Sequence, residues 1–259
     1  MATGRTLDRW LRLYSDGYDL SGYARQLSGG LKWEYETQAD ASWTDAVKNT
    51  IACGRATLGG FTLNAFFDNT ATLGPHVTHY GQGVKRVVMI AKGIRAAPAQ
   101  GDPVYCGEFD QLAYQAAVDS GIAVASIPFG EADAVSAAIA YSKPWGALLA
   151  PLLARTAVNA SAGVDGSAQT TKGGYLCYQI TAWNGTGNIT ISVDDSANNA
   201  DFLALSGATS GAIAHTAGHT AGVIALATTA TVRQYTRWQI ALAGGLVGAT
   251  FALAFVRGQ

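Results

Sequence analysis

Histidines at short spacing are the first residues whose types could do chemistry. His215 and His219 lie four apart in "HTAGHTAG", and His76 and His79 lie three apart in "PHVTHY". On a helix, a spacing of four would place two imidazoles on one face, where they could bind a metal ion. Glycines weaken a helix in the first motif, and neither pair has a partner carboxylate nearby. We therefore expect these histidines to be incidental and predict no metal site and no cofactor.

Motifs for catalysis or nucleotide binding are also missing from the sequence. It contains no G-x-x-x-x-G-K-[ST] loop and no G-x-S-x-G elbow, and "GQGVKR" is only a G-x-G before a strand-like run. Glu34 and Glu36 could do acid/base work, but a spacing of two places both on one face of a strand, opposite Trp33 and Tyr35. That is the ordinary pattern of a half-exposed strand, so we expect no enzyme.

The composition is poor in charge. Of 259 residues, 49% are hydrophobic and only 14% are charged, and the net charge is −1. A chain without a basic excess has no electrostatic footprint for nucleic acid and no polybasic patch for a membrane. The cysteines, Cys53, Cys106 and Cys177, are odd in number and form no CxxC, so we expect buried thiols. The N-terminus shows no apolar segment typical of a secretory signal.

The elements that would position any site are mostly strands. Apolar and β-branched runs alternate with turn-forming pairs such as Asp16 and Gly17 or Gly29 and Gly30, which predicts a mainly antiparallel sheet system. Two segments have helix-like spacing and predict short helices, "GGFTLNAFFDNT" (59–70) and "EADAVSAAIAYS" (131–142).

The C-terminal part is predicted to be a β-sandwich of the jelly-roll or immunoglobulin-like kind. Asn184 and Gly185 suit a tight hairpin between two strands, and Gly244 and Gly245 suit another. The uncharged run 240–256 is long enough to resemble a membrane span, but its residues alternate in size as in two buried strands. Most charged residues lie before about residue 150, and a Pro, Gly, Ala and Ser-rich stretch follows. We expect a domain at 1–155, a linker at 156–172 and the sandwich at 173–259.

Aromatic residues in the sandwich suggest one binding role. Tyr175, Tyr178 and Trp183 could stack on sugar rings if they were exposed. A carbohydrate-binding module for host attachment therefore stays open as an alternative function.

The chain as a whole resembles the major tail proteins, or tail tube proteins, of long-tailed bacteriophages. The resemblance spans both predicted domains and is carried by the segments "LDRWLRLYSDGYDLSGYAR", "TLNAFFDNTATLGPH", "GIRAAPAQGDPVYCGEFDQLAYQ", "IPFGEAD", "GYLCYQITAWNGTG", "TATVRQYTRWQIAL" and "TFALAFVRG". It implies a tail-tube-type β-barrel or sandwich domain followed by an outer decoration sandwich. A head decoration protein and a distal tail protein are the alternatives within the virion.

The resemblance also implies partners and a location. Copies of the chain would form stacked, hexameric rings in the virion tail, would meet tape measure and tail terminator or distal tail proteins, and would be made in the host cytoplasm. Genome DNA would pass through without sequence-specific binding, with no membrane partner. A neutral or acidic lumen would avoid gripping DNA phosphates, and the candidates for its lining are Glu34, Glu36, Asp40, Glu108 and Asp110.

The turns near the N-terminus are predicted to let an early edge strand bend toward a neighbouring subunit. The candidate ring-contact residues are Asp16, Gly17, Leu20, Ser21 and Gly22.

Overall fold

The computed structural model of the chain describes residues 8–31, 33–40, 49–81, 83–94, 96–131, 145–156 and 162–258, and in β4 and β5 it describes the backbone only. Within these ranges the chain is mainly antiparallel β-sheet, which confirms the predicted fold class. The α-helix within them is the short α1 (Pro75–His79), beside two 3₁₀ turns, η1 (Asp8–Trp10) and η2 (His215–Ala217).

A curved sheet surrounds the core of the first half of the molecule. Phe61 stacks on Phe129 with ring centroids 5.0 Å apart and packs edge-on against Phe109 at 5.2 Å. Buried side chains from five of its strands meet in this core, so the sheet curls round it like an open barrel. Its order is β1 (Leu11–Ser15), β7 (Val84–Lys92), β8 (Pro103–Gln111), β10 (Ile122–Glu131), β6 (Phe61–Phe66) and β3 (Ala24–Ser28), with β2 (Tyr18–Asp19) beside β1 and β9 (Gln115–Asp119) beside β10.

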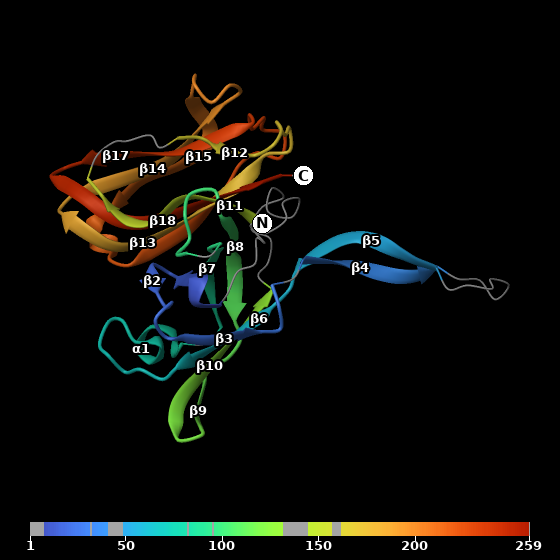
Figure 1. Cartoon of the computed structure of the whole chain (residues 1–259), viewed down its shortest axis with the longest axis vertical. Coiled ribbons are helices and arrows are strands. Elements are labelled where there is room, and N and C mark those ends of the chain that lie inside the picture. The colour runs from blue at the N-terminus through green and yellow to red at the C-terminus, as the bar shows by residue number, and fades with distance from the viewer. Residues whose placement is uncertain are drawn as a thin grey trace.

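The second half is the predicted β-sandwich (Figure 1). Four strands of the large sheet face a separate four-stranded sheet across a common apolar core. The first layer has the order β16 (Thr220–Ala225), β13 (Gly174–Gly185), β18 (Leu246–Arg257) and β11 (Trp145–Arg155). The second has the order β12 (Val164–Asp165), β17 (Tyr235–Ala243), β14 (Asn188–Ser196) and β15 (Leu203–Ala214).

Strand β18 is buried on both faces. Phe251, Leu253 and Phe255 enter the sandwich core, whereas Ala252 and Ala254 join a second core with residues of β1, β7 and β8. The alternation of large and small apolar residues follows from this burial, because the sandwich core takes the bulky side chains and the first half packs against the alanines. The membrane-like run at 240–256 is therefore strand and turn, and no described helix is long and apolar enough to cross a membrane.

The two glycine-containing turns of the sandwich join sheets, which corrects the predicted hairpins. Gly185 has φ +99°, and the chain passes there from β13 in the first layer to β14 in the second. Gly244 and Gly245, at φ +68° and +88°, likewise connect β17 to β18 across the layers. A left-handed backbone suits a tight connection of either kind, so the turn residues alone do not reveal which strands pair.

The two helices predicted from the sequence have different outcomes. Residues 59–70 contain strand β6 and not a helix, because the alternation of Phe61, Leu63 and Ala65 points three side chains into the barrel core. The helix predicted at 131–142 lies outside the described residues except for Glu131, which ends β10.

Strand β11 joins the two halves. It pairs with β8 through Trp145 to Ala147 and with β18 along most of its length. Pro151 lies within it, at a place where the register with β18 shifts and no regular ladder hydrogen bond is required. One sheet thus runs through both halves, and part of the predicted linker, Val164–Asp165, is strand β12.

The buried contact between the halves yields a prediction for Tyr175. Its hydroxyl donates a 2.7 Å hydrogen bond to the carbonyl of Cys106, and the side chain is 1% exposed. Tyr175→Phe removes the donor and should lower the free energy of unfolding by about 1–2 kcal/mol, measured by urea denaturation. Tyr80→Phe, at a residue 66% exposed, is the control and should change little. Equal stability of the Tyr175 variant and the native chain would contradict this account.

Candidate assembly surface

The β4–β5 hairpin stands apart from both cores. Strand β4 (Trp33–Asp40) pairs with β5 (Asn49–Leu58) in a sheet of its own, and neither pairs with any other described strand. In Figure 1 this hairpin projects away from the body of the molecule. A two-stranded hairpin is marginal by itself in water, and its outer edges carry unpaired N–H and C=O groups. Such an element is suited to pairing with another chain.

The turn at Asp16 is fixed within the chain. The Asp16 carboxylate lies 2.8 Å from the Arg86 guanidinium and accepts a 2.9 Å hydrogen bond from the backbone N–H of Val87. Arg86 also donates to the side-chain oxygen of Gln111. This bonding ties the end of β1 to β7 and occupies the charged group of Asp16.

Gly17 connects this turn to the sandwich. Its N–H donates a 2.7 Å hydrogen bond to the side-chain oxygen of Gln179, whose amide donates in turn to the carbonyl of Val87. Nδ1 of His219 lies 3.1 Å from the carbonyl oxygen of Gly17, and the His219 ring stacks on Tyr18 with centroids 4.4 Å apart. The segment therefore holds the two halves together.

These contacts correct part of the predicted ring-contact set. Gly17 is buried against β13 and β16, and Leu20 is fully buried in the barrel core, so neither can face a neighbouring subunit. Ser21 is half-buried and bonds to the backbone of Leu13. Gly22 is exposed with open space around it, and its role in a ring stays a prediction.

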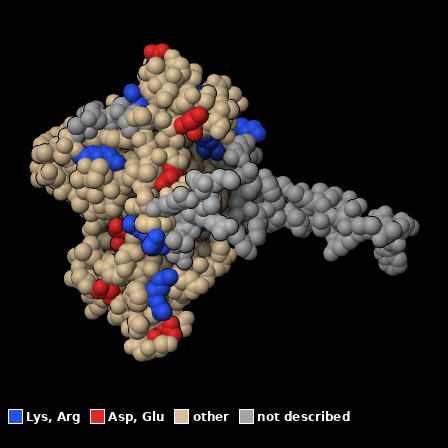
Figure 2. Space-filling view, viewed as in Figure 1, with Lys and Arg blue, Asp and Glu red and all other residues tan. Residues whose placement is uncertain are grey.

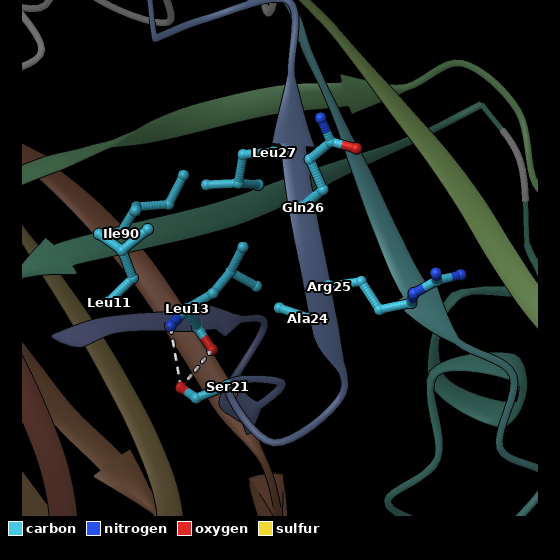
Figure 3. Close-up of a pocket in the computed structure, with 8 residues that line it drawn as sticks. All are labelled: Leu11, Leu13, Ser21, Ala24, Arg25, Gln26, Leu27 and Ile90. Atoms are coloured by element: carbon cyan, nitrogen blue, oxygen red, sulfur yellow. Dashed lines mark hydrogen bonds between the residues drawn. The ribbon is translucent and has the colours of Figure 1, made fainter. Parts of the chain in front are cut away.

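A cavity of about 220 Å³ lies where β1 and β3 approach one another. Figure 3 shows the lining side chains, with β6 on one side of β3 and the cavity on the other. Sequence patterns missed this place, because whether a strand lies at an edge depends on which distant segments pair with it. Five of the lining residues are apolar and three are polar: Leu11, Leu13, Ala24, Leu27 and Ile90, then Ser21, Arg25 and Gln26.

Basic residues accompany this cavity. Arg25 on β3 is exposed and lies 3.1 Å from Asp119, and Arg9 and Arg12 lie on η1 and β1. Figure 2 shows Lys and Arg atoms over this part of the molecule. Opposite charge on a partner would be favoured here.

The predicted lumen residues divide between two places. Glu34, Glu36 and Asp40 lie along β4, on the projecting hairpin. Glu108 and Asp110 lie half-buried on β8, where they pair in register with Val87 and Lys85. Burial raises the pKa of the Glu108 carboxyl above its ordinary value. The lining of a channel by either group stays a prediction.

The predicted sugar-stacking residues pack inward. Tyr175 is buried between the halves and presents no ring face to a ligand, so its assignment is wrong. Tyr178 and Trp183 are half-buried and pack against the sandwich core, and the Trp183 indole donates to the carbonyl of Gly218. The presence of aromatic residues in a strand does not distinguish an outer face from one covered by a second layer.

The histidines belong to separate places. His79 is fully buried, and its Nε2 lies 2.9 Å from the Ser15 hydroxyl, whereas Nδ1 of His76 lies 3.1 Å from the Tyr114 hydroxyl. His215 in η2 lies beside Gly187. Among the described residues, no three His, Cys, Asp or Glu side chains come together as metal ligands. Cys106 and Cys177 are free and buried, as predicted, and the Cys53 side chain lies outside the described ones.

Comparisons with known proteins give little. No protein-family model and no curated protein matches the chain. Among solved structures, it is similar to the Dit protein of phage SPP1, described as a paradigm of the hub adsorption apparatus in phages that infect Gram-positive bacteria. The identity is 11% and the TM-score 0.34, over 95% of this chain and 98% of that chain. A likeness at this level carries no argument about fold or function.

The glycine at the turn yields a prediction with a matched control. A Cβ at Gly17 would lie 2.4 Å from the backbone nitrogen of Thr220, and φ there is +82°. Gly17→Ala should therefore destabilise the chain by about 2 kcal/mol or more. Gly22→Ala, with no atom within 4 Å, should cost less than about 0.5 kcal/mol. Thermal and urea unfolding of both variants measure the difference. Equal losses of stability would contradict the packing of this turn against β13 and β16.

Buried His79 yields a prediction for the pH dependence of stability. Burial lowers its pKa from 6.5 to about 3, so the folded chain keeps it neutral where the unfolded chain binds a proton. The part of the free energy of unfolding that depends on neutral His79 is fully present above pH 6.5. It is lost as the pH falls toward 3, by at most roughly 1.4 kcal/mol per pH unit. His79→Gln should reduce this dependence in urea titrations at pH 4 to 7, whereas His215→Gln should retain it. Identical profiles for the His79 variant and the native chain would contradict the assignment.

Proposed function

We propose that the chain is a structural subunit of a bacteriophage tail that assembles with copies of itself into a ring. The observation that carries the proposal is the β4–β5 hairpin, which pairs with no other described strand and projects from the body. Its backbone groups gain partners when the hairpin adds to the sheet of a neighbour.

Closure into a ring follows from the kind of contact. The hairpin lies on one side of the chain, and in the proposed ring a neighbour receives it on a different surface. Such a head-to-tail contact leaves one donor and one acceptor free at each step, and it ends when a rotation closes the ring. The low charge content suits a chain whose surface becomes interface.

The assignment to a phage tail draws on the sequence resemblance to tail tube proteins. In the finer form of the proposal, six copies form each ring, rings stack into a tube, and genome DNA passes through it. The acidic residues of β4, Glu34, Glu36 and Asp40, are then the first candidates for a lumen that repels phosphate. The sandwich would decorate the outside, and the chain would have structural work and no catalysis.

Assembly as a function of concentration tests the proposal. Light scattering after gel filtration, with negative-stain electron microscopy, should find rings of uniform diameter, or tubes, in the native chain. Replacing residues 34–57 by a two-residue turn removes the proposed contact and should abolish the particles. The shortened chain can close there because Trp33 and Leu58 are directly paired. Circular dichroism and urea unfolding should show that this variant keeps the native fold.

Two results would overturn the proposal. One is a native chain that stays monomeric at every concentration, and the other is a hairpin-less variant that forms the same rings. A particle of one ring without stacking would support the ring and reject the tube.

A further inference from the structure

We propose that the open edge of β3, with the cavity beside it, receives strand β4 of a second copy of this chain. The inference rests on the proposed ring assembly and names its acceptor surface. It also gives the acidic residues near the start of β4 a partner.

The acceptor is a strand with one free edge. Residues Ala24 to Ser28 pair with β6 along one side, and no other described strand pairs with β3. Figure 3 shows that the free side faces the cavity, toward Ile90 and Leu11. An added strand would find backbone partners on β3 and a pocket for its side chains, the two features of strand addition.

The cavity suits an aromatic side chain. It measures about 220 Å³, and its lining combines aliphatic residues such as Leu27 with the polar Arg25 and Gln26. An apolar cavity of about 150 Å³ already accommodates a benzene-sized group. A strand that places one ring there would cover the half-buried Leu11, Ala24 and Leu27, whereas Leu13 and Ile90 are already buried.

The rim of the cavity favours acidic neighbours. Arg25 is exposed, its guanidinium lies 5.4 Å from the Phe66 ring, and its bond to Asp119 is open to solvent. Arg12 lies between Leu11 and Leu13 on β1 and donates to the carbonyls of Arg9 and Leu11, so Arg25 is the positive charge among the residues that line the cavity. The preferred strand thus carries aromatic residues on one side and carboxylates on the other.

Strand β4 has this pattern in its sequence. Trp33 and Tyr35 alternate with Glu34 and Glu36, and residues 33–40 contain no Lys or Arg. A period of two places Glu34 on the opposite side of the strand from Trp33 and Tyr35, and Glu36 lies where the register with β5 shifts. β4 follows β3 after a short connection and leads away from the body in Figure 1, so its own β3 edge is out of reach. The occupant is therefore β4 of another copy.

The inference changes one earlier expectation. Glu34 and Glu36 would lie near Arg25 of the neighbouring copy and would not line a lumen. Asp40, farther along β4, is left as the lumen candidate on this strand.

Charge exchange across the contact tests the inference. The acceptor variant is Arg25→Glu with Gln26→Glu, and the donor variant is Glu34→Lys with Glu36→Lys. Each should raise the concentration needed for assembly at least about tenfold, because like charges then face each other. A chain carrying all four substitutions should return to within about threefold of the native value, which misfolding could not produce. Lys172→Glu, an exposed charge reversal on the sandwich, is the matched control and should assemble normally.

Mixing the two variants adds a second readout. In an equimolar mixture, β4 of the acceptor variant faces the native β3 edge of the donor variant, and β4 of the donor variant faces the charge-reversed β3 edge of the acceptor variant. Both contacts are complementary in charge, so light scattering should find assembly in the mixture at concentrations where neither variant assembles alone.

The outcomes separate this inference from the proposed function. If the native chain forms rings and the acceptor variant forms them equally well, the acceptor is elsewhere and only this inference falls. If the chain with all four substitutions needs as high a concentration for assembly as the chains with two, this inference falls as well. A native chain that never associates overturns both, and a native dimer with the predicted charge response keeps the contact and rejects the ring.

Discussion

The burial of β13 and β18 on both faces is the constraint on which the rest of the structure depends. Odd and even positions of these strands enter different cores, so the sandwich and the open barrel share one layer. Gln179 reinforces that junction by bonding to the turn at Gly17 and to β7. The two halves cannot be separated without exposing both cores, which leaves the hairpin as the part free to act on other molecules.

Unpaired strand edges link this fold to assembly. The two cores satisfy most strands within the chain, but the outer edges of β4 and β5 and one side of β3 have no partner among the described strands. An open edge beside an apolar cavity invites aggregation unless a specific partner covers it. The acidic residues of β4 and the exposed Arg25 beside the β3 edge are the basis of our proposal that a copy of the chain is that partner.

The sequence predicts the strands better than their pairing. Alternation located β13, β14, β17 and β18, and it distinguished the run at 240–256 from a membrane helix. It could not show that Gly185 and Gly244 join two sheets, since a positive φ serves both kinds of turn. β6 was mistaken for a helix because three phenylalanines also fit a period near 3.6, and β11 was missed because Pro151 suggested a linker. Glu34 and Glu36 were predicted from sequence to line a lumen, and that role stays a prediction. The burial of Leu20 and Tyr175 and the open edge of β3 arise from contacts between distant segments, which no local pattern contains.

Hydrogen–deuterium exchange followed along the chain at low and high protein concentration tests the central claim most directly. In dilute protein, amides of β13 and β18 should be protected while those of β4 and the free edge of β3 exchange fast. On assembly, β4 and β3 should become protected together, with β13 and β18 unchanged. Assembled particles in which β4 and β3 still exchange as in the monomer would contradict the account.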